Sequence, residues 1–320
     1  MNRKFLILVI FLFTFLLSCN MFYIAVRNIP VFFATPDTVA VKIKNPIKDN
    51  IRLSALWIGH ATVLLQMDDK IIITDPLLTE TTGELARRVI DPGIDIDNIP
   101  PCNLILISHS HYDHLNFSSI ALLEKKSKKT NLVFPKDLEN YLPDYNLSFV
   151  RMNNDYGYKK SIIGEEKIIN GIKVTTVFAA HLGGRYGLDG FAWGDHSFTG
   201  YIIEYNGMTV YFAGDTGYDP DKFKQLGEKF NIDLAMIPIG PCADCNNCGT
   251  KNHVFPPDAV QIFKDLNAKI MIPIHYGTFM FAQADPMEPL FALKKIMAEE
   301  KLDDKIKILK IGEQIELIKK

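Results

Sequence analysis

The chain has 320 residues, of which 48% are hydrophobic and 22% are charged, and these proportions are ordinary for a globular enzyme. The formal net charge is −2, and the basic residues are scattered along the sequence instead of forming the patch or stripe that nucleic-acid-binding proteins carry. This composition disfavours nucleic acid as a partner.

The first 19 residues form the clearest break in composition. Two basic residues precede an apolar run over residues 5–17, which at 13 residues matches the core of a secretory signal and is short for a membrane span. The run ends in Leu-Leu-Ser-Cys, which resembles a bacterial lipobox and makes Cys19 a candidate for lipidation. Alternatively, residues 21–26 prolong the run into an uncleaved anchor. Either way, we expect an exported protein that is attached to a membrane through its N-terminus.

Residues 20–50 contain Pro30, Pro36 and Pro46 and are predicted to form an extended connector. Residues 51–320 read as short apolar strands mixed with helices. Strands are predicted over residues 53–58, 61–67, 71–74, 104–107, 172–178, 198–205, 209–212, 234–238 and 270–274, with a final pair within 305–318. Helices are predicted over residues 117–126, 220–230, 257–266 and 289–300. The mixture indicates one α/β domain in which sheets pack face to face with helices outside.

Metal-ligand residue types are concentrated at residues 108–114, directly after the predicted strand 104–107. The sequence Ser-His-Ser-His-Tyr-Asp-His supplies His109, His111, Asp113 and His114 in a chain that has only 8 histidines. Such side chains repel one another when charged and stay unsatisfied when buried, unless a cation compensates them. Because imidazole and carboxylate groups are typical zinc ligands, this loop is predicted to bind metal.

Three later strands each run into a residue that can ligate metal. The strand at 172–178 leads to His181, the strand at 209–212 leads to Asp215, and the strand at 270–274 leads to His275. One shared edge of the sheets is the simplest explanation for this repetition. The resulting seven candidates are too many for one tetrahedral zinc and suit two metals that share a carboxylate.

The motif His-x-His-x-Asp-His and the later candidates resemble the metallo-β-lactamase superfamily. Further blocks resemble the branch that contains the N-acyl-phosphatidylethanolamine-hydrolysing phospholipase D. These blocks are Trp-Ile-Gly-His-Ala-Thr at 57–62, Thr-Asp-Pro at 74–76, Phe-Ala-Gly-Asp-Thr-Gly-Tyr at 212–218, Ile-Pro-Ile-Gly at 237–240 and His-Tyr-Gly-Thr-Phe at 275–279. The resemblance implies an αββα sandwich of two mixed β-sheets, with helices on the outer faces and the site at one edge of the sheets.

The resemblance also implies how two zinc ions would be held. His109, His111 and His181 would bind one zinc; Asp113, His114 and His275 would bind the other; and Asp215 would bridge them. Two zinc ions that share a hydroxide lower its pKa and clamp the oxygens of a phosphodiester. Together with the resemblance, this implies a small-molecule or lipid substrate, and we expect a zinc-dependent phosphodiesterase of phospholipase D type, acting on N-acyl-phosphatidylethanolamine-like or other lipid phosphodiesters.

The predicted catalytic set consists of Asp215, Asp113 and His253. His253 matches a histidine that the branch places near the metals without making it a core ligand. It is predicted to contact phosphate or to donate a proton to the leaving group, and a structural loop histidine is the alternative. Asp75 is predicted to hydrogen-bond a ligand imidazole, with a simple turn residue as the alternative. His60 is expected to be structural, and nothing catalytic is expected of His196.

The sequence departs from the phospholipase pattern at three places. Asn116 stands where the branch often has Asp, residues 153–160 lack a tryptophan-rich segment, and the loop at 241–249 is foreign to the branch. We expect these segments to line the substrate groove, so the departures affect lipid specificity and leave the chemistry intact.

Four cysteines remain besides Cys19: Cys102, Cys242, Cys245 and Cys248. The last three could hold zinc or an iron–sulfur cluster only with a fourth ligand. Outside the cytoplasm, a disulfide within the trio or free structural thiols is the more ordinary expectation.

Two other functions stay open. One is a metal-dependent lactone or ester hydrolase, because sugar-lactone hydrolases occupy a neighbouring branch with similar ligands. The other is a non-catalytic binding lipoprotein, which absence of bound metal would favour. β-Lactam hydrolysis is not expected, because the blocks around Asp215 and His275 match the other branch. No oligomeric state is predicted.

Overall fold

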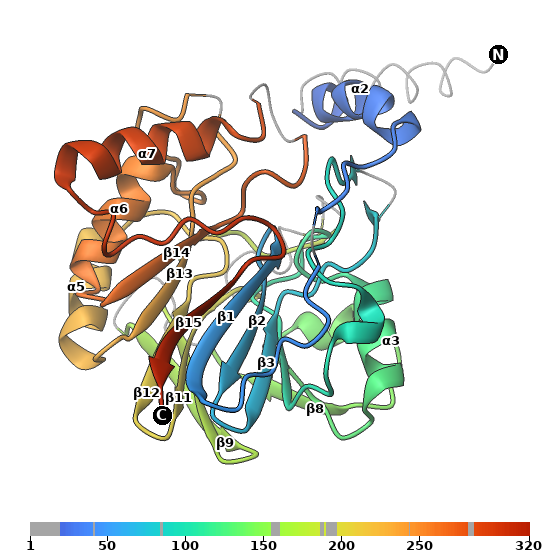
Figure 1. Ribbon diagram of the computed structural model, residues 1–320, viewed down its shortest axis with the longest axis vertical. Helices are drawn as coiled ribbons and strands as arrows, with labels where there is room; N and C mark the ends of the chain where they lie inside the picture. The colour runs from blue at the N-terminus through green and yellow to red at the C-terminus, as the bar shows by residue number, and fades with distance from the viewer. Residues whose placement is uncertain are drawn as a thin grey trace.

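The computed structural model describes residues 20–40, 42–83, 86–154, 161–185, 189, 197–242, 244–280 and 285–320, without the side chains of residues 20–25 and 27. Two large β-sheets pack face to face, and helices cover both outer faces (Figure 1). The predicted αββα sandwich of two mixed sheets is therefore confirmed.

The first sheet has seven strands in the order β15-β1-β2-β3-β6-β7-β8. Its strands are β1 (Ile51–Gly59), β2 (Thr62–Met67), β3 (Lys70–Thr74), β6 (Leu104–Leu106), β7 (Asn131–Pro135), β8 (Ser148–Met152) and β15 (Gln314–Lys319). The pairs from β15 to β3 are antiparallel, and the pairs from β3 to β8 are parallel. Of the predicted final strand pair, only β15 forms; residues 305–307 run beside Met271 as an isolated bridge instead.

The second sheet has six strands in the order β14-β13-β12-β11-β10-β9. Its strands are β9 (Ile163–Ile169), β10 (Ile172–Val177), β11 (Gly200–Tyr205), β12 (Met208–Phe212), β13 (Leu234–Pro238) and β14 (Ile270–Ile274). β12, β13 and β14 are parallel, and the other pairs are antiparallel. The short strands β4 (Thr81–Thr82) and β5 (Ala86–Arg87) form a separate ribbon.

Alternation along β1 shows how the layers are held together. Leu53, Ala55 and Trp57 point into the hydrophobic core between the two sheets, whereas Leu56 and Ile58 point into a second core on the opposite face. Because both faces are covered, β1 is apolar almost throughout.

The helices close the two cores from outside. α3 (Phe117–Lys126) packs on the first sheet through Ile120 and Leu123. The second sheet is covered by α5 (Pro220–Lys229), α6 (Pro256–Asp265) and α7 (Glu288–Glu300). Each of these three helices has a proline in its first turn, where the missing N–H costs no hydrogen bond.

The prediction of an extended connector over residues 20–50 is wrong for its first part, because α2 (Asn20–Phe33) is helical. Pro30 lies inside α2, where a proline removes one backbone donor and its ring crowds the carbonyl group one turn earlier, at a cost of about 3 kcal/mol. Contacts with the domain stabilise α2: Asn28 Nδ2 donates to Met280 O at 3.0 Å. In the described part of the chain, no helix is long and apolar enough to cross a membrane. Cys19 and the predicted signal lie outside the described residues.

Candidate metal centre

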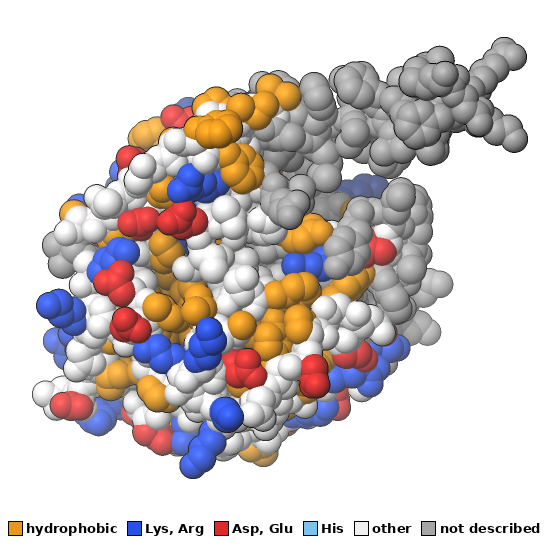
Figure 2. All heavy atoms as spheres, turned by 90° about the vertical axis from the view of Figure 1, so that its right-hand side faces the viewer, with side chains coloured by type: hydrophobic (Ala, Val, Ile, Leu, Met, Phe, Trp, Pro, Cys, Tyr) orange, Lys and Arg blue, Asp and Glu red, His pale blue; other side chains and the backbone are white. Residues whose placement is uncertain are grey.

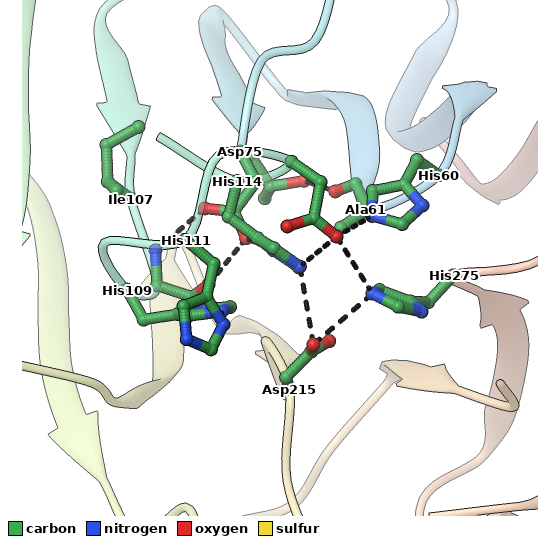
Figure 3. A network of polar contacts seen from close by, with 12 residues as sticks. His60, Ala61, Asp75, Ile107, His109, His111, His114, Asp215 and His275 are labelled. Atoms are coloured by element: carbon green, nitrogen blue, oxygen red, sulfur yellow. Dashed lines mark hydrogen bonds and ion pairs between the residues drawn. The ribbon is translucent and has the colours of Figure 1, made fainter. Parts of the chain in front are cut away.

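Residues that can ligate metal converge where strands of both sheets end. They are His60 after β1, Asp75 after β3, the loop with His109, His111, Asp113 and His114 after β6, His181 after β10, Asp215 after β12 and His275 after β14. Neighbouring parallel strands end at the same edge of a sheet, which brings β3 next to β6 and β12 near β14. Figure 3 shows side chains from these strands pointing toward one another.

Four of the predicted ligands form one group, which we call the Asp113 group: Asp113, His114, Asp215 and His275. Asp215 Oδ2 lies 3.4 Å from His114 Nε2 and 3.2 Å from His275 Nε2. Asp113 Oδ2 lies 3.5 Å and 3.6 Å from the same two nitrogens. Atoms that surround one zinc tetrahedrally at about 2.0–2.1 Å stand about 3.3 Å apart. The spacing of the Asp113 group fits a single metal ion among its four side chains.

The other three predicted ligands form the His111 group: His109, His111 and His181. His111 Nδ1 lies 2.9 Å from His109 Nε2 and 3.1 Å from His181 Nε2. Ligand-type atoms of His181, Asp215 and His253 also lie within 4.8 Å of one another. Asp215 therefore belongs to the Asp113 group and also lies beside His181 of the His111 group, which is where a bridging carboxylate would lie.

Hydrogen bonds at the far side of the imidazole rings fix their tautomers. His114 Nδ1 lies 2.7 Å from Asp75 Oδ2, and a carboxylate oxygen accepts, so Nδ1 carries the proton. His109 Nδ1 lies 2.9 Å from Ser108 Oγ, whose own proton goes to Asp75 Oδ2 at 2.5 Å. In the neutral form of both rings this leaves a lone pair on Nε2, the nitrogen that faces the ligand group.

The His111 group has too few protons to satisfy its nitrogens. His181 Nδ1 donates to Asn252 O at 2.9 Å, so His181 and His109 both direct an Nε2 lone pair at His111 Nδ1. His111 Nδ1 carries at most one proton, and burial lowers the pKa of His111 to about 4. Burial also lowers the pKa of His109 and of His181 well below the ordinary value. A metal ion would satisfy all three nitrogens together.

The Asp113 group likewise fits a cation. Among the described residues, the buried His114 Nε2 and Asp215 Oδ1 have no hydrogen-bond partner. Burial by itself would raise the pKa of Asp113 and of Asp215, but His114 and His275 hold both pKa values well below the usual range. Both side chains are therefore carboxylates at neutral pH. Burial by itself would lower the pKa of His114 and of His275, but the carboxylates raise the first well above its ordinary value and the second to about 9. A metal ion would take the place of the positive charge on these two rings.

Two residues next to the groups bear on their assignment. The side chain of His253 is 32% exposed, and its Nδ1 lies 3.5 Å from Asp215 Oδ2. His60, which the sequence suggested to be structural, places Nε2 at 2.9 Å from Asp113 Oδ2 and its ring centroid 4.0 Å from that of His275. His60 also follows directly on β1, and this strand-end position was the signal that could have marked it. His196 lies outside the described residues.

Sequence reasoning missed Arg185. Its guanidinium is buried between the rings of Tyr112 and Phe117, with 4.2 and 4.1 Å to their centroids. Nη1 donates to the carbonyl oxygens of Ser110 at 2.8 Å and Leu115 at 2.9 Å. Arg185 therefore ties together the two ends of the loop that carries four of the predicted ligands.

Two of the three segments that depart from the phospholipase pattern have structural roles, and residues 155–160 of the third lie outside the described residues. Asn116 caps α3, because its side chain accepts from the backbone N–H of Ser119 at 2.9 Å. Cys242 and Cys245 form a disulfide, as expected for the trio, and Cys248 is an exposed free thiol. The Cys102 thiol is buried, far along the chain from the trio.

A sequence profile of the β-lactamase superfamily domain matches residues 70–276, which is more than half of the chain. The chain belongs to the metallo-β-lactamase superfamily. A metal-dependent hydrolase from Sulfurisphaera tokodaii is 30% identical to this chain over 264 residues, which cover 82% of the chain and 98% of the relative. The chain thus belongs with the metal-dependent hydrolases of the metallo-β-lactamase superfamily.

Other members of the superfamily match over most of the domain. N-acyl-phosphatidylethanolamine-hydrolyzing phospholipase D 1 from Caenorhabditis elegans is 29% identical over 266 residues, covering 79% of this chain and 72% of the relative. The chain spans 64% of the length of mycobacterial relatives that are 28% identical. A metallo hydrolase from the archaeon Ignicoccus hospitalis shares the fold at 21% identity with a TM-score of 0.57, covering 82% of this chain and 97% of that one.

Proposed function

We propose that the chain is a two-zinc phosphodiesterase of phospholipase D type, with N-acyl-phosphatidylethanolamine-like or other lipid phosphodiesters as its substrates. The position of Asp215 carries this proposal. Its Oδ2 lies 3.4, 3.2 and 3.5 Å from nitrogens of His114, His275 and His253. The name of the Caenorhabditis elegans relative supports the substrate class.

The side chains of the two groups would hold the ions and orient the substrate between them. Two bound zinc ions would acidify a water molecule and neutralise the charge that develops on the phosphoryl oxygens. Asp215 contributes the shared carboxylate, and Asp113 contributes a second charge in the same group. Asp75 keeps the Nε2 lone pair of His114 directed at the site through the hydrogen bond to Nδ1.

His253 is assigned a role in contact with the substrate, because its side chain is partly exposed at the edge of the site, whereas His114 and His275 are buried. We assign to it a contact with the phosphate or proton donation to the departing alcohol. Protonation matters most for a poor leaving group. His253→Ala should therefore slow hydrolysis of an alkyl phosphodiester more than that of a p-nitrophenyl phosphodiester, and an equal effect on both would argue against proton donation.

The decisive experiment measures metal content and phosphodiester turnover on the same preparation. Elemental analysis of the full chain is combined with an assay on bis(p-nitrophenyl) phosphate. Asp215→Asn removes the central charge with little change in shape, and Asp304→Asn in an exposed turn is the matched control. We expect about two zinc ions per wild-type chain. Turnover by Asp215→Asn should fall by more than the roughly 10- to 100-fold that is typical when a residue that only supports a metal ligand is replaced.

The other outcomes separate the remaining functions. Bound metal without phosphodiester turnover would move the assignment to a lactone or ester hydrolase, which p-nitrophenyl esters and sugar lactones would reveal. A chain that binds no metal would overturn the catalytic proposal and favour a binding lipoprotein. An Asp304→Asn variant as inactive as Asp215→Asn would show that the assay reports damage to the fold.

Export and membrane attachment are part of the same proposal. The apolar run at residues 5–17 and the sequence Leu-Leu-Ser-Cys that ends at Cys19 support lipidation after export. Metabolic labelling with a fatty acid should mark the wild type and not Cys19→Ser. An unlabelled wild type that still sediments with membranes would favour the uncleaved anchor.

A further inference from the structure

An apolar stripe runs along one side of α2. Val26, Ile29 and Phe33 are 44%, 54% and 87% exposed. At 3.6 residues per turn, these three positions fall within about 60° of one another around the helix axis. α2 contains no acidic residue, and Arg27 is its single charged residue. Large apolar side chains exposed together mark an interaction surface.

The opposite side of α2 is fixed to the domain next to the metal centre. The side chain of Asn28 is buried and donates to the carbonyl oxygen of Met280 at 3.0 Å. The neighbouring Phe279 is buried, and its ring centroid lies 5.4 Å from that of His60. α2 is thus linked to the Asp113 group through Met280, Phe279 and His60, and its apolar stripe faces away from the domain.

Exposed apolar residues of α7 lie at the same end of the molecule. Met287 and Phe291, at the start of α7, are 37% and 62% exposed. Figure 1 shows α2 and the start of α7 at one end and β9 at the other. In Figure 2, hydrophobic side chains gather along the upper edge, next to the residues drawn in grey. We call Val26, Ile29, Phe33, Met287 and Phe291 the apolar rim.

We propose that the apolar rim docks on the surface of a lipid bilayer, with α2 lying in the membrane plane. Arg87 Nη1 donates to Phe32 O at 2.7 Å, so the C-terminal part of α2 is held against the domain and presents only its outer side. Amphipathic helices that lie in the membrane plane bury their apolar side at the boundary between headgroups and acyl chains. The chain that precedes α2 supports a bilayer over a protein partner, because residues 5–17 are an apolar run.

This docking would bring the metal centre to the membrane surface. The contact from Asn28 through Met280 and Phe279 to His60 fixes the distance between the apolar stripe and the Asp113 group. A substrate in the bilayer would then reach the site without leaving the membrane. The inference goes beyond the proposed function, because it holds whichever ester bond the site hydrolyses.

Quenching by brominated lipid tests the docking on the full chain. Phe33→Trp and the control Ile168→Trp, a 75% exposed position on β9, are each bound to vesicles of phosphatidylethanolamine and phosphatidylglycerol. Emission is compared with and without bromine on the acyl chains, after subtraction of the wild-type signal. We expect Phe33→Trp to shift to shorter wavelength and to be quenched, and Ile168→Trp to keep its emission.

Two outcomes would overturn the inference. If Phe33→Trp sediments with the vesicles but bromine does not quench it, the rim faces solvent, residues 1–19 or a second copy of the chain. The second measurement uses the double variant Ile29→Ser and Phe33→Ser. It should lose turnover of a vesicle-embedded substrate and keep that of bis(p-nitrophenyl) phosphate; unchanged turnover on vesicles would contradict the docking. If the wild type hydrolyses neither substrate, only the proposed function fails, and the quenching result still decides the docking.

Discussion

Asp75 and His114 form a hydrogen bond of 2.7 Å between Oδ2 and Nδ1, and neither side chain has any exposed surface. The same carboxylate accepts from Ser108 N at 2.7 Å and from Ser108 Oγ at 2.5 Å. Asp75 therefore connects the end of β3 to the beginning of the loop that carries four of the predicted ligands. The prediction that Asp75 hydrogen-bonds a candidate ligand imidazole is confirmed.

Asp75→Asn should weaken zinc binding about 10- to 100-fold, which is typical when the partner of a ligand histidine is lost. The amide can accept at only one oxygen, so one of the donors from His114 and Ser108 would face an NH₂ group. Competition with a zinc-binding dye measures the change. Ser108→Ala removes one of these donors and should have a smaller effect; equal zinc affinity in wild type and Asp75→Asn would contradict the assigned role.

Removal of metal should destabilise the fold, because buried carboxylates and imidazole lone pairs would lose their cation. Zinc at a hundredfold excess over its Kd should contribute about 2.7 kcal/mol per bound ion to the free energy of unfolding. Thermal unfolding after chelation, followed by addition of zinc or magnesium, measures this. Magnesium should restore little, because nitrogen ligands favour zinc. An unchanged melting temperature on chelation and zinc addition would argue that the described site holds no metal.

His60→Ala should lower zinc affinity while the chain still binds about two ions at saturating zinc. Burial lowers the pKa of His60 to about 3, so the neutral ring donates its Nε2 proton to Asp113 Oδ2. His60→Gln places an amide donor at similar reach and should recover most of the affinity. Loss of one ion per chain in His60→Ala, measured by elemental analysis at saturating zinc, would instead make His60 a direct ligand.

Arg185→Lys should lower the free energy of unfolding by about 2–4 kcal/mol, because the ammonium group lacks the planar guanidinium that stacks on two rings and reaches the carbonyl oxygens of Ser110 and Leu115. Urea unfolding measures the loss, and zinc titration shows whether the loop still binds metal. Arg151→Lys is the control, because Arg151 is 44% exposed and pairs with Glu139. If both variants unfold alike, Arg185 does not hold the loop together.

Most of the strands that were predicted from sequence are buried along their length. β1, β2, β13 and β14 lie between covered faces, so their continuous apolar runs were visible without the structure. β8 is mostly exposed and β9 is only partly buried, and both were missed. β7 was missed as well, although four of its five residues are buried. α2 was also missed, because Pro30 and the later prolines at 36 and 46 were given more weight than the contact between Asn28 and the domain, which no local pattern shows.

For the metal centre, the sequence determined which residues are available. Histidine and aspartate are concentrated after β6, and single ligand-type residues follow β10, β12 and β14. The chemistry of these residue types was enough to predict that they bind a cation. Only the tertiary structure decided the rest. It placed Asp215 at the border of the two groups, directed His60 at Asp113, and buried Arg185 under the loop. These contacts join residues far apart in the chain, and their distances depend on how the two sheets pack, which local sequence does not encode.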